Sequence, residues 1–127
     1  MVQGIEHVAL ASPDPERLAQ WYVERLGFAL VAHFPSTKTC FVRAPNGSML
    51  EVISCNESPR GEQQLRDIGL RHLAIRVSEF ESVYQSLKAA DVRFISEPET
   101  AAGNRIVFFT DPDGNYLHLI HRPQPLG

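Results

Sequence analysis

The feature that most constrains the fold of this chain is an internal duplication. Residues 4–10 align with residues 69–75, and His7 falls against His72, an offset of 65 residues. A second match aligns 46–53 with 113–120, at an offset of 67 residues. Because both matches occur in the same order and at nearly the same offset, a supersecondary unit of about half the chain is expected to occur twice.

Each copy has the same predicted order of elements: a strand, a helix and three more strands. In the first copy, Pro15 suits the first turn of the helix and Gly27 suits the residue after its end. Asn46-Gly47 predicts the turn of the last hairpin. The expected strands of this copy are 4–10, 28–34, 40–43 and 49–54.

The second copy repeats the series after a polar linker over 56–68. An apolar stripe at helical spacing from Phe80 to Ala90 predicts its helix. Its expected strands are 70–77, 92–96, 106–110 and 116–121. The sequence therefore predicts an α+β fold of two tandem βαβββ modules, about 4–55 and about 69–122, within a single domain over 1–127.

Four polar residues occupy equivalent positions in otherwise aliphatic strands. His7 and His72 lie in the first strands, and Glu51 and His118 in the last. A buried carboxylate at Glu51 would need a partner or a cation. If the modules pack around a pseudo-twofold axis, His7 meets His72 and Glu51 meets His118. Three imidazoles and one carboxylate are ligand types of a transition-metal site.

A single histidine in a strand is more often satisfied by a hydrogen bond than by a metal. The equivalence of the four positions in the repeat favours a metal site for this set. His33 and His121 have no such equivalent of ligand type, so we expect structural roles for them.

The order of elements and the motifs HVAL, WYVERLGF, LRHLAIRV and FFTDPDGNYLHLI resemble the vicinal oxygen chelate superfamily. That superfamily includes glyoxalase I, the type I extradiol dioxygenases, methylmalonyl-CoA epimerase, and the bleomycin- and fosfomycin-resistance proteins. The resemblance runs from Gly4 to Arg122. It implies a curved, mostly antiparallel sheet around a metal cleft. It also implies that the metal ligands are His7, Glu51, His72 and His118.

The ligand pattern resembles glyoxalase I most closely, with His118 where most metal-dependent members have Glu. The resemblance therefore implies a glyoxalase-I-like lyase or isomerase that chelates a small vicinal-oxygen substrate and stabilises an enediolate. Glu51 is the expected catalytic base, as the only carboxylate of the set. The ligands suit Ni, Zn, Fe, Mn or Co, and the metal is left undecided. A non-catalytic bleomycin-resistance-type binding protein and an Fe(II) dioxygenase remain open alternatives.

The expected substrate cleft is small and largely apolar. At its rim, Arg105 or Arg43 could hold an anionic group of the substrate, although both also suit solvated strand ends. The substrate-binding candidates are Met49, Ile106, Phe108, Tyr116 and Arg105.

Charge and composition argue against several partner classes. The net charge is −3 and no run of five basic residues occurs, which disfavours nucleic acid. No apolar stretch is long enough to cross a membrane, and the N-terminus does not read as an export signal. Cys40 and Cys55 form no disulfide framework or CxxC motif. We expect a cytoplasmic protein that binds a small molecule and forms a C2 homodimer, the commonest closed symmetry.

Overall fold

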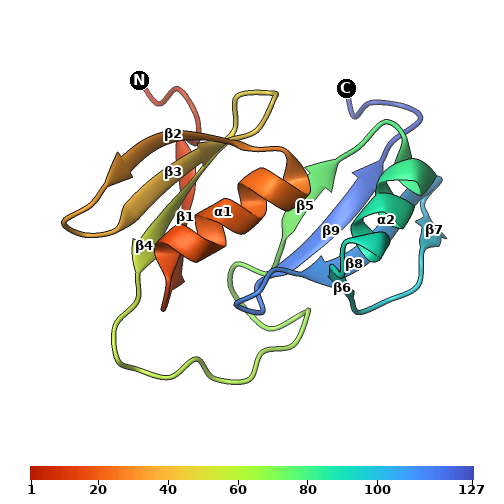
Figure 1. Ribbon diagram of the computed structural model, residues 1–127. Coiled ribbons are helices and arrows are strands. Elements are labelled where there is room, and N and C mark those ends of the chain that lie inside the picture. The colour runs from red at the N-terminus through yellow and green to blue at the C-terminus, as the bar shows by residue number, and fades with distance from the viewer. The chain divides into compact units, whose positions relative to one another are not determined.

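The computed structural model describes residues 1–127, which divide into two compact units, Met1–Arg60 and Gly61–Gly127. Each unit contains its own sheet and one long helix (Figure 1). The elements of the first unit are β1 (His7–Ser12), α1 (Pro15–Leu26), β2 (Ala29–Phe34), β3 (Thr39–Arg43) and β4 (Met49–Ser54). Those of the second are β5 (Leu73–Arg76), α2 (Phe80–Ala89), β6 (Arg93–Phe94), β7 (Glu99–Ala101), β8 (Asn104–Thr110) and β9 (Tyr116–His121).

The first sheet has the strand order β1-β4-β3-β2, and α1 contacts all four strands. The pair β1–β4 is parallel and the other pairs are antiparallel. The helix begins where the Asp14 side chain accepts a hydrogen bond from the Arg17 amide, with Pro15 in the first turn. It ends at Gly27, whose φ of 74° is left-handed, as the sequence predicts.

The second sheet has the order β5-β9-β8-β6, with β7 also pairing with β8. Here too the pair that joins the first and last strands, β5–β9, is parallel, and the remaining pairs are antiparallel. Helix α2 packs on β9 through a buried apolar stripe. The core of this unit includes Phe80, Tyr84, Leu87, Val107, Phe109, Leu117 and Leu119.

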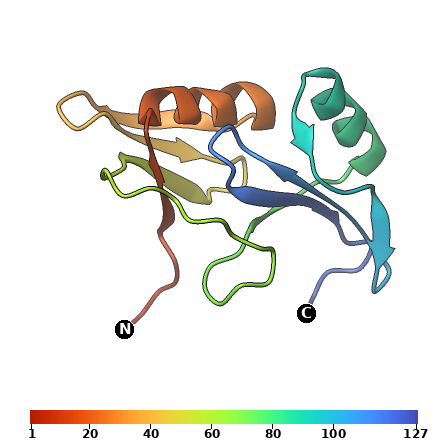
Figure 2. The same cartoon turned by 90° about the horizontal axis from the view of Figure 1, so that it is seen from below.

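In each unit the helix covers one face of its own sheet (Figure 2). We call the other face of the same sheet the helix-free face. Successive side chains of a strand point to opposite faces, so alternate residues share one face. In β4, Leu50 and Val52 are buried beneath α1, while Met49, Glu51 and Ile53 lie on the helix-free face. In β9, Leu117 and Leu119 are buried beneath α2, and His118 and Ile120 lie on the helix-free face.

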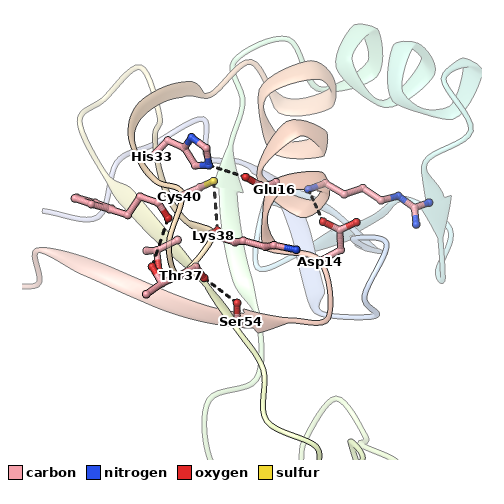
Figure 3. A network of polar contacts seen from close by, with 10 residues as sticks. Asp14, Glu16, His33, Thr37, Lys38, Cys40 and Ser54 are labelled. Carbon is pink, nitrogen blue, oxygen red and sulfur yellow. Dashed lines mark hydrogen bonds and ion pairs between the residues drawn. The ribbon is translucent and has the colours of Figure 1, made fainter.

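The helix side of the first unit has its own polar contacts (Figure 3). Nε2 of His33 on β2 lies 2.6 Å from Oε2 of Glu16 on α1, which ties the edge strand to the helix. Opposite His33 on β3 is Cys40, whose pKa is raised by burial and by the Glu16 charge. In the second unit, Nδ1 of His121 donates to the carbonyl of Val77 at 3.0 Å. Both histidines outside the candidate metal set thus have protein partners.

The α+β class with two βαβββ modules is confirmed, with one sheet in each unit and a short additional strand, β7. The strands expected to start at residues 4 and 70 start at His7 and Leu73 instead. The aliphatic side chains of Ile5 and Leu70, which suggested the earlier starts, are 87% and 88% exposed. No helix has the length and apolar character that a membrane crossing requires.

Candidate metal centre

The first candidate ligands, His7 and Glu51, are neighbours on the helix-free face of the first sheet. In the parallel pair β1–β4, Ala9 lies opposite Glu51, and His7 precedes Ala9 by two residues on the same face. Nε2 of His7 lies 3.4 Å from Oε1 of Glu51. Both side chains are partly exposed, so the pair is accessible.

The other ring nitrogen of His7 has a partner next to it in the chain. Nδ1 lies 2.8 Å from Oε1 of Glu6, and a carboxylate can only accept, so Nδ1 carries the hydrogen. In the neutral ring, Nε2 then presents a lone pair to the carboxylate of Glu51. Two acceptors 3.4 Å apart repel each other unless a cation or a proton lies between them. Glu6 was not among the predicted residues, because alternation places it on the other side of the strand.

The second pair, His72 and His118, has the same geometry in the second unit. In the parallel pair β5–β9, Ala74 lies opposite His118, and His72 precedes Ala74 by two residues. The centroids of the two imidazole rings are 4.4 Å apart. The sequence alone did not indicate that each first-strand histidine would lie beside the candidate ligand of its own module.

His118 is buried, with 8% of its surface exposed, and its Nδ1 has no hydrogen-bond partner. Burial, together with the charges of His72 and Arg122, lowers the pKa of His118 from 6.5 to about 4. The ring is therefore neutral at neutral pH, the form in which an imidazole binds a metal.

A phenylalanine on the neighbouring strand packs against each pair. The ring of Phe41 meets His7 edge-on, with centroids 5.5 Å apart and an interplanar angle of 84°. The ring of Phe108 meets His72 in the same way, at 5.7 Å and 89°. The repeat in the sequence is thus a repeat of side-chain geometry as well as of strands.

The structure gathers no group of three or more His, Cys, Asp or Glu side chains that could hold a metal ion. The four candidates form two pairs, one in each unit. Their chemistry fits a metal all the same. When the His7 ring is neutral, the first pair directs two acceptors toward each other, and the second pair contains a buried imidazole with an unpaired nitrogen. The predicted meetings of His7 with His72 and of Glu51 with His118 stay predictions.

Four of the five substrate-binding candidates, Met49, Ile106, Phe108 and Tyr116, lie on the helix-free face of their own sheet. The Tyr116 hydroxyl donates to the carbonyl of Gln63 at 2.7 Å. Arg105 lies on the helix side, since it alternates with Ile106.

The guanidinium of Arg105 bonds to Glu81 of α2 at 3.1 Å and lies 5.5 Å from the centroid of the Phe80 ring. The structure therefore does not bring Arg105 together with Ile106, Phe108 and Tyr116 of its own unit. Arg43 lies beside Met49 on the helix-free face and donates to its sulfur at 3.4 Å.

Two arginines that were not predicted, Arg76 and Arg122, lie on the helix-free face of the second sheet. Arg76 follows Ala74 by two residues, and Arg122 follows His118 by four. This even spacing is the sequence signal that could have identified them.

The chain matches known proteins along nearly its whole length. Residues 4–119 match the family model described as the Glyoxalase/Bleomycin resistance protein/Dioxygenase superfamily. The uncharacterized protein YwkD of Bacillus subtilis is 29% identical, over 94% of this chain and 97% of that protein. The 2-epi-5-epi-valiolone epimerase of an Actinomyces species is 27% identical, over 94% of this chain and 80% of the epimerase.

A solved structure shares both the fold and part of the sequence. It is the glyoxalase family protein from Enterococcus faecalis, which is 27% identical and superposes with a TM-score of 0.76, over 93% of this chain and 97% of that one. The match to the family model covers more than half of the chain. The chain therefore belongs to the Glyoxalase/Bleomycin resistance protein/Dioxygenase superfamily.

Proposed function

We propose that this protein is a metal-dependent vicinal oxygen chelate enzyme whose metal ligands are His7, Glu51, His72 and His118. The observation that carries the proposal is the identical register of the two pairs, each across a parallel first-to-last strand contact. When bound, the metal would chelate two adjacent substrate oxygens and stabilise the negative charge that develops on them. Nickel, zinc, iron, manganese and cobalt all suit this set of donors.

Glu51 is the group that would move a proton. It is the only carboxylate among the four residues, and its Oε1 faces Nε2 of His7. His118 would not compete for this role, because the single lone pair of its neutral ring would be bound to the metal. Glu6 holds the His7 ring through Nδ1, and such a partner fixes the tautomer and the orientation of a ligating imidazole.

The reaction we propose is a proton transfer beside a carbonyl, as in a glyoxalase-I-like lyase or isomerase. Two features support it. Phe108 and Ile106 give the face around the imidazole pair an apolar lining, which would limit the access of water to an enediolate. In addition, a relative 27% identical to this chain is named an epimerase.

The test begins with the metal content of the purified protein, followed by a substrate screen in D₂O. Small 2-hydroxy carbonyl compounds and hemithioacetals are the probes, and exchange of the proton beside the carbonyl is followed by NMR. We expect about one divalent ion per chain and exchange that is lost in Glu51→Gln. A folded wild-type protein that takes up no divalent metal would instead indicate a binding protein. Oxygen consumption that requires Fe(II) would indicate a dioxygenase.

We also propose that the protein forms a C2 homodimer. Light scattering at micromolar concentration should give a mass about twice the 14.2 kDa of one chain. A particle of the mass of a single chain would overturn this assembly.

A further inference from the structure

Two arginines lie together at one end of the helix-free face of the second sheet. Arg76 is the last residue of β5, and its partner across the parallel pair is Ile120 of β9. Arg122 directly follows β9, so alternation places it on the same face as Ile120 and His118. Residues two apart along a strand are about 6.6 Å apart. Ile120 therefore lies about 6.6 Å along the strand from His118. Arg76 lies beside Ile120 on the neighbouring strand, and Arg122 follows Ile120 by two residues.

The side chains of Arg76 and Arg122 make no hydrogen bond or ion pair in the structure, and neither residue is fully buried. Other arginines of this unit do have partners. Arg105 pairs with Glu81, and Arg71 donates to the carbonyl of Gln64. Two unpaired guanidinium groups around one aliphatic residue favour an anion between them.

The first unit has no counterpart of this pair of charges. At the offsets of the repeat, Arg76 corresponds to Ala11 and Arg122 corresponds to Cys55. Both halves therefore have the same strand arrangement, but only the second half has the two arginines. A feature that the fold required would be expected in both halves.

The other charged side chains on this face lie farther away. Glu99 of β7 lies opposite Ile106, which in turn lies opposite Ile120, so two strand spacings of about 4.8 Å separate Glu99 from Ile120. Arg93 of β6 lies opposite Thr110, at the other end of β8. It has the same charge as the two arginines and faces the same side of the sheet, which makes it a matched control.

We propose that Arg76 and Arg122 form a binding site for an anionic group, a carboxylate or a phosphate, of the substrate. The assignment to a substrate rests on the proposed function, whereas binding of the anion itself requires no metal. The substrate would then be an anionic vicinal-oxygen compound, with its charged end about two residues along the strand from His118. The guanidinium groups would bind that end and orient the neutral oxygens toward the imidazoles.

The experiment titrates the metal-free protein with sodium phosphate and, separately, with sodium propionate. Amide chemical shifts of Ala74 and Ile120 are followed by NMR at low salt. Binding should shift these two amides, and the probe that binds more tightly identifies the anion class. Arg76→Gln and Arg122→Gln should each weaken binding about tenfold or more. Arg93→Gln should change it less than about twofold, since an exposed charge at that separation is largely screened.

Three results would overturn the site: no binding of either probe, shifts only at distant amides, or equal losses in Arg93→Gln and the two test variants. Arg122→Lys keeps the charge but not the paired donors, so it should recover part of the affinity. Metal uptake is measured separately, on portions of the same preparations that are incubated with a divalent ion. Anion binding in a protein that takes up no metal would refute the proposed function and leave the anion site standing. Full metal uptake without anion binding would refute the anion site and leave the proposed function standing.

Discussion

The two units of this chain share a scaffold and differ in chemistry. Both carry a parallel pair between first and last strands, with two candidate ligands across it and a phenylalanine edge-on to the first histidine. In the first unit the pair is an imidazole with a carboxylate, and Glu6 adds a second carboxylate. In the second unit it is two imidazoles, and the arginines Arg76 and Arg122 lie on the same face of the sheet.

The carboxylates of the first unit are suited to taking up protons, whereas the arginines of the second unit are suited to binding negative charge. A carboxylate has lone pairs on two oxygens, so it could ligate a metal and still take up a proton, whereas the single lone pair of a neutral imidazole would be used by the metal. Under the proposed function, both halves would supply metal ligands, Glu51 of the first half would transfer the proton, and the arginines of the second half would bind an anionic group. The duplicated backbone gives both halves equivalent side-chain positions, but different residue types occupy these positions in each half.

The largest effect should come from removing one ligand of each pair. If Glu51 and His118 are metal ligands, Glu51→Gln and His118→Leu should each lower metal affinity more than about a hundredfold. Loss of a residue that only orients a ligand costs up to about that much. Metal content after dialysis against a weak chelator measures this. His33→Gln is the matched control, since His33 is bonded to Glu16 on the helix side, and it should retain the metal.

Full metal retention in His118→Leu would break the comparison at this point. The candidate set would then reduce to His7, Glu51 and His72, and His118 would be a packing residue beneath Phe108. His118→Glu should separate these readings further, because a carboxylate at this position can ligate as well.

The second prediction concerns acid and the metal-free protein. Because the pKa of His118 is about 4 in the folded chain against 6.5 unfolded, the unfolded chain binds an additional proton between these values. The free energy of unfolding should therefore fall as the pH falls from about 6.5 to about 4. The share of His118 is at most roughly 3 kcal/mol, at 1.36 kcal/mol for each pKa unit.

Urea unfolding of the wild type and of His118→Leu at about pH 7 and about pH 4.5 measures this share. The variant should lose less stability than the wild type between the two conditions. An equal loss in both proteins would show that His118 is not responsible for the pH dependence.

A smaller effect is expected at the equivalent hairpin turns of the two units. Gly47 and Gly114 have φ values of 96° and 84°, which side chains rarely adopt. Gly114→Val should lower the free energy of unfolding by about 1–2 kcal/mol, and Gly47→Val by a similar amount. A Cβ at Gly47 would meet nothing within 4 Å, so its cost should be backbone strain alone. Chemical denaturation compares the two, and a neutral Gly114→Val would contradict the conformation of the last turn.

The smallest effect concerns the starts of the helices, where the units differ. The Asp14 side chain caps α1, whereas the side chain of Glu79 makes no capping bond at the start of α2. Asp14→Ala should cost about 1 kcal/mol, and Glu79→Ala close to nothing. Thermal unfolding of the two variants provides the measurement. An equal loss in both would mean that the Asp14 bond does not contribute to stability.

The repeat made most of this fold predictable, because its offsets align strands, helices and turns at once. It also identified the four candidate ligands, since alternation places every second residue of a strand on one face. Four features were not predicted from it. The first strands begin three residues later than expected, because Ile5 and Leu70 are aliphatic but exposed. Strand β7 has only three residues and too little pattern to detect.

The third feature concerns the arginines. Arg105 was expected near the substrate, although its odd position places it with Val107 and Phe109 on the helix side. Arg76 and Arg122 carry the even spacing that marks the helix-free face. The pairing of each histidine with the last strand of its own module also depends on the parallel register, which alternation alone does not reveal.

The parallel strand pairs have a consequence for how the protein folds and opens. Ala9 and Glu51, like Ala74 and His118, are roughly 40 residues apart in the chain, so closing these contacts costs more chain entropy than closing the hairpins between them. We expect the edge strands β1 and β5 to dock last during folding and to detach first in native-state fluctuations. An ion bound across these contacts would hold the edge strands in place. Its loss would accelerate amide hydrogen exchange in β1 and β5 while the hairpins of each sheet stay protected.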